Sequence, residues 1–284
     1  MTAKISALSF TWQEAHCIEQ ALQQLRPYVE EIIIVDQQSP DGTADIARKY
    51  DVKVHIRPRL ICGDGYREFL RHQATQPWIL WFYPDERFVH SNVKEGEDPE
   101  ATLKSFEALT KIDKYSCFSF MRHEFMDGVE LPFERFYPNY QTRLIRNLPE
   151  IQYPDLVHFN MWGHNPPSVC NLPPEIHMEH HKTSAEQELD NWRLYVEYKN
   201  LINRYGNTDI EPYKVYLDSY KQIIHDSEEK NLTGERLIHR AEEFPWDWRI
   251  YENTERITLE QFEKEFGMVY KDWIEKRRKI EGRT

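Results

Sequence analysis

Residues 5–56 alternate between short apolar runs and helical or polar segments, and this order restricts the fold more than any other feature of the chain. The run at 31–36 is nearly continuous, which is typical of a strand covered on both faces. It follows a first predicted strand at 5–10 and a helix whose apolar positions recur at helical spacing, at Ile18, Ala21, Leu22 and Leu25. A short helix at 43–50 and a third strand at 52–56 come next. This alternation with short connections predicts a parallel sheet and an α/β fold.

Two of the predicted strands end in carboxylates. The run at 31–36 ends at Asp36, and a later apolar run at 78–83 leads into Pro84, Asp85 and Glu86. The carboxyl ends of parallel strands meet at one edge of a sheet, where open α/β sheets bind their ligands. We therefore expect Asp36 and Asp85 at the same edge, where their oxygens suit a divalent cation.

Charge and cysteine content narrow the class of protein. The chain has 36 basic and 48 acidic residues, a net charge of −12, which argues against a nucleic-acid partner because phosphate binding needs clustered Lys and Arg. The four cysteines fit no zinc spacing, so we expect reduced, buried thiols in a cytoplasmic protein. No apolar run approaches the length of about 18 residues that a membrane span needs. Peripheral membrane contact stays open.

The pattern changes along the second half of the chain. Strands are predicted at 116–121 and 141–146, joined by a long irregular connection, and helices follow from Ser184 onwards. Long irregular connections in compact domains are usually functional. We expect an α/β domain at residues 1–204 and a helical extension at 205–284, whose apolar faces suit internal packing or a homodimer.

The order of these motifs resembles family-2 glycosyltransferases of the GT-A fold, and among them the bacterial lipopolysaccharide-core and lipooligosaccharide β-glucosyltransferases. The resemblance covers roughly residues 4–185. It implies a Rossmann-like, mainly parallel sheet flanked by helices. The segments that carry it are Gln13–Glu14, Asp36, Ser39, Asp41–Thr43, Trp78–Leu80, Arg143–Arg146, Val157–His158 and Ile176–His181.

The resemblance implies three donor-binding residues. Asp36 would bind the base or ribose of a nucleotide sugar, Arg67 its diphosphate, and Glu14 would also contact the donor. Each has a simpler interpretation: Asp36 caps the turn at Ser39, Arg67 forms a surface ion pair with Asp64, and Glu14 stabilises a helix start.

The resemblance also implies a metal ligand and a base. Asp85 would hold Mn²⁺ or Mg²⁺ and so act in catalysis, with His180 and His158 as candidate further ligands. The family's metal motif has an acid two positions earlier, where this chain has Tyr83. The general base would be Asp155.

Glu124 and Asp127 are rival candidates for that base. The activity implied is inverting transfer of a hexose from a nucleoside-diphosphate sugar, UDP-glucose first, to a glycan or glycolipid hydroxyl. Two alternatives stay open: a non-catalytic nucleotide-sugar-binding or scaffold protein, and a glycosyltransferase acting on a protein or a modified nucleic-acid base. Tyr83 and Phe159, which replace family acids, motivate the first of these.

Overall fold

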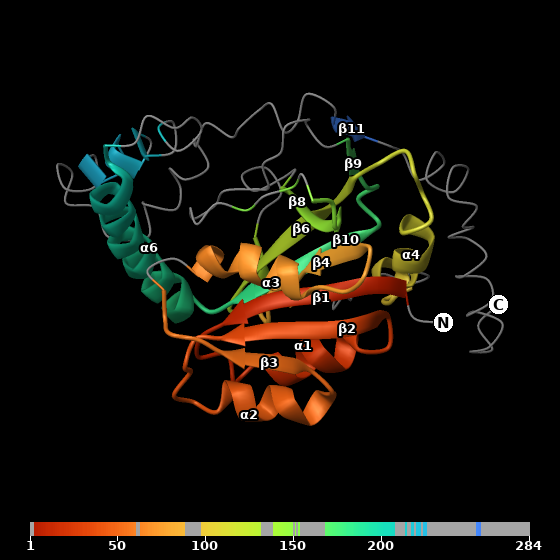
Figure 1. Cartoon of the computed structure of the whole chain (residues 1–284), viewed down its shortest axis with the longest axis horizontal. Coiled ribbons are helices and arrows are strands. Elements are labelled where there is room, and N and C mark those ends of the chain that lie inside the picture. Colours follow the sequence, from red (N-terminus) through yellow and green to blue (C-terminus); the bar gives the residue numbers. More distant parts are fainter. Residues whose placement is uncertain are drawn as a thin grey trace.

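The computed structural model describes most of the chain up to residue 207 and short pieces beyond it. The described residues are 3–60, 63–88, 98–131, 139–149, 151, 153, 168–207, 214, 217, 218, 220–222, 224, 225 and 254–256. Figure 1 shows that they build one twisted sheet with helices packed against it.

The sheet joins a parallel half to a mixed half. Its path runs β11-β9-β6-β8-β4-β1-β2-β3, with β10 beside β5 and β6, and β7 beside β6. Neighbours among β4, β1, β2 and β3 are parallel, whereas β8 runs antiparallel to β4 and β6. The strands are β1 (Ala3–Thr11), β2 (Val29–Asp36), β3 (Lys53–Ile56), β4 (Trp78–Trp81), β5 (Glu86–Arg87), β6 (Cys117–Met126), β7 (Val129–Glu130), β8 (Tyr140–Arg146), β9 (Val169–Asn171), β10 (His177–Lys182) and β11 (Thr254–Arg256).

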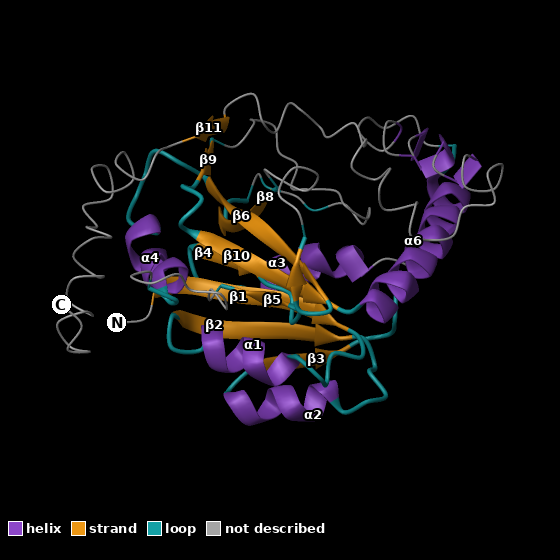
Figure 2. Ribbon diagram, turned by 180° about the vertical axis from the view of Figure 1, so that it is seen from behind, coloured by secondary structure: helices purple, strands orange, loops and turns teal. Residues whose placement is uncertain are grey.

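Helices cover the sheet on both faces. Figures 1 and 2 show α1 and α2 on one side of β1 and β2, and α3 on the other. One apolar cluster joins α1 and α4 to the sheet through residues such as Leu22, Ile34 and Phe106, and a second joins α3 through Leu70 and Ile33. The helices are α1 (Ile18–Leu25), α2 (Thr43–Ala47), α3 (Arg67–Gln73), α4 (Ala101–Leu109) and α6 (Ser184–Tyr205), with 3-10 turns η1 (Arg48–Tyr50) and η2 (Gly63–Tyr66).

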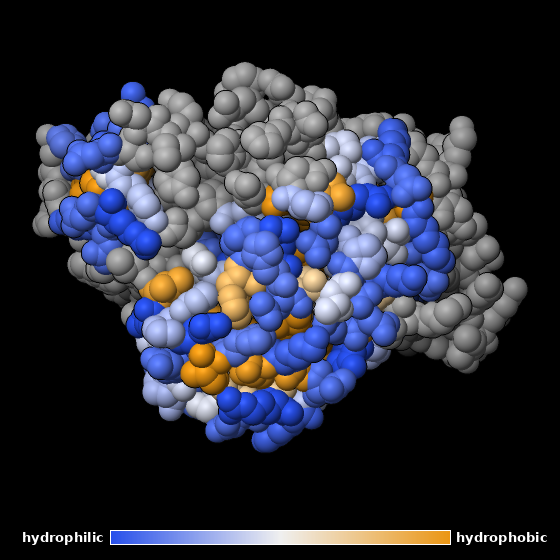
Figure 3. Space-filling model, viewed as in Figure 1, coloured by the Kyte–Doolittle hydropathy of each residue, from blue (hydrophilic) through white to orange (hydrophobic). Residues whose placement is uncertain are grey.

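On the face in Figure 3, hydrophilic residues cover most of the described part, with small apolar patches between them. Among the described residues, no helix has the length and apolarity that crossing a membrane requires.

The predicted α/β class and the predicted early strands are confirmed, with three differences. The first helix begins at Ile18 rather than Glu14, so Glu14 lies in a loop. The segment expected to be an irregular connection after residue 121 instead continues β6 to Met126, and residues 177–182 form a strand. Most of the predicted helical extension at 205–284 lies outside the described residues.

Candidate functional site

The loop after β1 is held in place by the loop after β2. Three backbone N–H groups of the first loop donate to three side chains of the second: Gln13 to Ser39 Oγ at 3.0 Å, Glu14 to Thr43 Oγ1 at 2.9 Å, and Ala15 to Asp41 Oδ2 at 3.0 Å. Gly42 between them has φ +86°, a left-handed conformation that favours glycine. The Ser-x-Asp-Gly-Thr motif therefore shapes the loop that carries Glu14.

Asp36 is buried at the carboxyl end of β2, with 1% of its surface exposed. Its Oδ2 accepts a hydrogen bond from Thr11 Oγ1 at 3.2 Å, and its Oδ1 accepts one from the Ser39 backbone N–H at 2.9 Å. The turn-capping interpretation of Asp36 is thus present in the structure. Its donor-binding role stays a prediction.

Arg67 opens α3 and lies between an acid and a tyrosine. Its Nη2 is 2.6 Å from Asp64 Oδ1 and donates to the Tyr83 hydroxyl at 2.7 Å. Burial raises the pKa of Tyr83, although Arg67 opposes this, so the phenol keeps its proton. The residue that replaces the first acid of the family motif is therefore neutral and binds Arg67.

Asp85 directly precedes β5 and meets His180, which lies within β10 and pairs with Glu86 of β5. β1 lies between β2 and β4, so Asp36 and Asp85 share the carboxyl edge of the parallel strands, as predicted. Asp85 Oδ2 is 3.0 Å from His180 Nε2 and 4.0 Å from Lys182 Nζ. The other imidazole nitrogen, Nδ1, is 2.6 Å from Glu124 Oε2.

The charges around His180 are balanced in a largely buried setting. Burial alone would raise the pKa of Asp85, but His180 and Lys182 hold it well below its usual range. Burial alone would lower the pKa of His180, but Asp85 and Glu124 raise it, against an opposing effect of Arg122. The metal-free site therefore favours an imidazolium that donates to both carboxylates.

Behind this pair lies a buried ion-pair network that the sequence analysis did not identify. Glu86, 3% exposed, accepts two hydrogen bonds from Arg143, at 3.0 Å from Nε and 2.5 Å from Nη2. Arg122 lies 3.5 Å from Glu86 and 2.6 Å from Glu124. The network joins β5, β6 and β8 and sets the position of Glu124 against His180. The signal available in the sequence was the spacing of Arg122 and Glu124, two residues apart on β6, which places them on one face of the strand.

The rival bases are engaged elsewhere. Burial alone would raise the pKa of Glu124, but Arg122 and His180 lower it to about 2, so it is a weak base. Asp127 accepts hydrogen bonds from the Ser184 backbone and hydroxyl at the start of α6. The predicted base Asp155 and the predicted ligand His158 lie outside the described residues.

Residues 11–95 match the family model described as Glycosyl transferase family 2. The chain is similar to that family over this segment, 85 of its 284 residues. The segment contains the loop after β1, Asp36, Arg67 and Asp85. An uncharacterized glycosyltransferase of Rickettsia conorii, RC0292, is 34% identical over 86 residues, which are 30% of this chain and 30% of that protein. One of Rickettsia bellii is 36% identical over 86 residues, which are 30% of this chain and 29% of that protein.

The matched segment thus spans less than a third of the length of these curated relatives. Among solved structures, S. aureus TarS 1–349 in complex with UDP has a TM-score of 0.43 at 16% identity, covering 80% of this chain and 71% of that one. Glucosyl-3-phosphoglycerate synthase of Mycobacterium tuberculosis with Mn²⁺, UDP and glucosyl-3-phosphoglycerate has a TM-score of 0.31 at 17% identity, covering 44% of each chain.

Proposed function

We propose that this chain transfers a hexose with inversion from a nucleoside-diphosphate sugar to a hydroxyl of a glycan or glycolipid. UDP-glucose is the preferred donor in this proposal. The contact between Asp85 and His180, at the carboxyl edge of a family 2 segment, carries this proposal. An oxygen and a nitrogen ligand lie 3.0 Å apart there, on side chains that are only partly exposed.

The ligand atoms of Asp85 and His180 fit a divalent cation, Mn²⁺ or Mg²⁺. Asp85 offers a carboxylate oxygen, and His180 offers Nε2 once its Nδ1 proton is directed to Glu124. A histidine that ligates metal almost always donates its second N–H to such a partner. Cations of this class take few protein ligands and complete their shell with water and substrate phosphates. Bound at Asp85 and His180, the cation would supply Lewis-acid stabilisation of the diphosphate leaving group.

The remaining roles belong to the chain's own groups. Two residues would orient the nucleoside: Asp36, and Glu14 on the loop held by Ser39, Asp41 and Thr43. Arg67 would face the diphosphate. The base that removes the acceptor proton would be Asp155, since the low pKa of Glu124 excludes efficient proton removal by that group.

Asp85→Asn tests the proposal directly. We expect loss of UDP-glucose turnover with Mn²⁺ present and an unchanged fold, because the amide keeps the shape but removes the charge. Asp113→Asn is the matched control, since Asp113 is 96% exposed in its pair with Arg146. Near-normal turnover in the Asp85 variant contradicts the proposal.

A second candidate is a binding protein without turnover. The neutral Tyr83, bound to Arg67, replaces an acid of the family motif and favours it. UDP-dependent thermal stabilisation with no hydrolysis or transfer in the presence of Mn²⁺ would support this candidate, because a ligand that binds only the folded state raises the melting temperature.

A further inference from the structure

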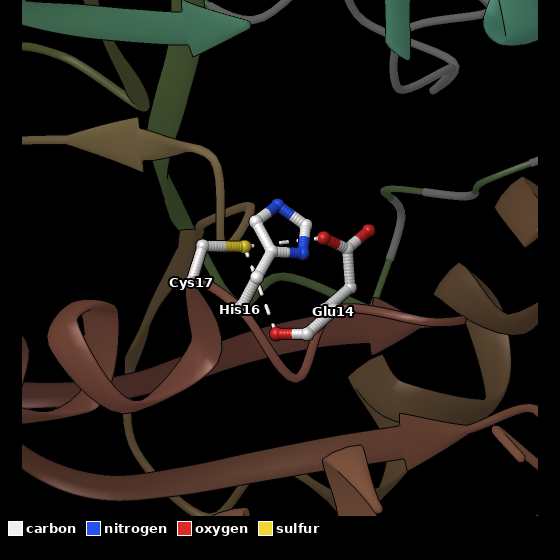
Figure 4. Close-up of side chains that lie close together, drawn as sticks. All are labelled: Glu14, His16 and Cys17. Carbon is white, nitrogen blue, oxygen red and sulfur yellow. Dashed lines mark hydrogen bonds between the residues drawn. The ribbon is translucent and has the colours of Figure 1, made fainter. Parts of the chain in front are cut away.

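A second group of potential metal ligands lies on the loop between β1 and α1. It consists of Glu14, His16 and Cys17, and one ligand atom of each lies within 4.8 Å of the other two. Figure 4 shows the carboxylate, imidazole and thiol turned toward a common point. The Cys17 thiol donates to Glu14 Oε2 at 3.3 Å. His16 and Cys17 have no part in the proposed transfer.

The loop that carries this group is fixed on two sides. Its backbone N–H groups donate to side chains of Ser39, Asp41 and Thr43, which lie between β2 and the first residue of α2. On the other side, His16 Nε2 lies 3.0 Å from Glu186 Oε1 in the first turn of α6. Glu186 is itself held by a reciprocal capping box with Thr183. A proton on Nε2 that is donated to Glu186 leaves Nδ1 available as a ligand, an arrangement common around metal-bound histidines.

The charges around Cys17 also favour a cation. The buried Cys17 thiol is in contact with the Glu14 carboxylate, so negative charge lies beside the sulfur. The same negative surroundings stabilise a bound divalent ion. Binding would exchange the S–H bond for a sulfur–metal bond and release one proton to solvent, with no change in oxidation state.

We propose that Glu14, His16 and Cys17 form a zinc site that is separate from the Asp85–His180 pair. Thiolate, imidazole and carboxylate together are the ligand types that zinc takes, whereas an oxygen-rich set suits Mn²⁺ or Mg²⁺. Metal–ligand distances of about 2.0 to 2.3 Å need the three ligand atoms slightly closer than 4.8 Å, a small side-chain adjustment. Three protein ligands leave a fourth position for water. The site shares Glu14 with the proposed donor-binding loop, whereas His16 and Cys17 belong to this site alone.

Cobalt titration of the full chain, reduced and stripped of metal, tests the site. We expect one equivalent of Co²⁺ to produce a thiolate-to-cobalt charge-transfer band in the near ultraviolet, and Zn²⁺ to displace it. Cys17→Ser should abolish the band. Cys117→Ser, at a buried thiol on β6, should keep it. Absence of the band in the wild-type chain, or its persistence in Cys17→Ser, overturns the proposal.

Two further variants distinguish metal binding at this site from misfolding and from binding at the Asp85–His180 pair. His16→Ala changes an exposed residue and should weaken Zn²⁺ binding by at least about 10-fold, measured by competition with a chromophoric chelator. Asp85→Asn should retain the band, which separates this site from the proposed catalytic cation. Unchanged zinc affinity in His16→Ala, or loss of the band in Asp85→Asn, refutes the assignment.

Discussion

Glu124→Gln should weaken the proposed catalytic cation without removing either of its ligands. Glu124 accepts hydrogen bonds from Arg122 Nε at 2.6 Å and from Asn139 Nδ2 at 2.9 Å, both on Oε1. Its other oxygen lies 2.6 Å from His180 Nδ1. In the glutamine variant, the amide oxygen stays with the two donors, and the NH₂ group must then face His180.

That substitution reverses the tautomer of the histidine. An NH₂ group opposite Nδ1 requires Nδ1 to accept, so the proton moves to Nε2, the atom that faces Asp85 and the cation. Loss of such an outer partner costs about 10- to 100-fold in metal affinity, or about 1.4 to 2.8 kcal/mol. Saturating metal should recover most of the turnover rate, because Asp85 and His180 are still present.

The assay is UDP-glucose hydrolysis or transfer as a function of Mn²⁺ concentration. Glu130→Gln is the matched control, since Glu130 Oε1 also lies 2.6 Å from a histidine Nδ1, that of His123, on the hairpin formed by β6 and β7. In Glu124→Gln we expect the half-saturating Mn²⁺ concentration to rise at least about tenfold. A value within about twofold of wild type refutes the tautomer argument.

Three other measurements address stability and loop geometry. Arg143→Met leaves the buried Glu86 with only Arg122 as its partner among the described residues, at 3.5 Å. The free energy of unfolding measured in urea should therefore fall by about 3 to 5 kcal/mol. In metal-free protein, the pKa of His180 is raised above its ordinary value of 6.5, so its stabilising contribution is complete below that pH and is lost as pH rises through the folded-state pKa. His180→Asn should flatten this part of the pH–stability curve. Thr43→Val removes the acceptor for the Glu14 backbone N–H and should raise the KM for UDP-glucose more than it lowers kcat, as steady-state kinetics would show.

The parallel half of the fold could be predicted because each element there has a local pattern. Residues 31–36 are almost entirely apolar, and the helix at Ile18–Leu25 has one apolar face. The predicted start of that helix was wrong, since the backbone N–H groups of residues 13–15 donate to side chains of Ser39, Asp41 and Thr43. Local periodicity does not contain such tertiary contacts.

Only part of the candidate site could be predicted from the sequence, for a related reason. Asp36 and Asp85 are marked by their positions after apolar strands, and the parallel topology then places them at one edge. Glu86, Arg122 and Arg143 form their network across three strands whose pairing is antiparallel or crosses over, so the alternation of Arg122 and Glu124 along β6 indicates a shared face but not the partners. Buried charges of this kind are recognised only when their partners are known.

The pairing of β10 with β6 decides which histidine meets Asp85. Three histidines lie on β10, and side chains alternate between the two faces of a strand. His180 lies opposite Glu124 on β6 and Glu86 on β5, on the face that carries Arg122 and Lys182. His181 faces the other way, stacked on Phe125 and 2.7 Å from Glu179. A shift of one residue would exchange the two faces and move His180 away from Asp85. The hydrogen bond between Glu124 and His180 therefore also helps to fix the register, and a histidine cluster in the sequence becomes a single candidate ligand in the fold.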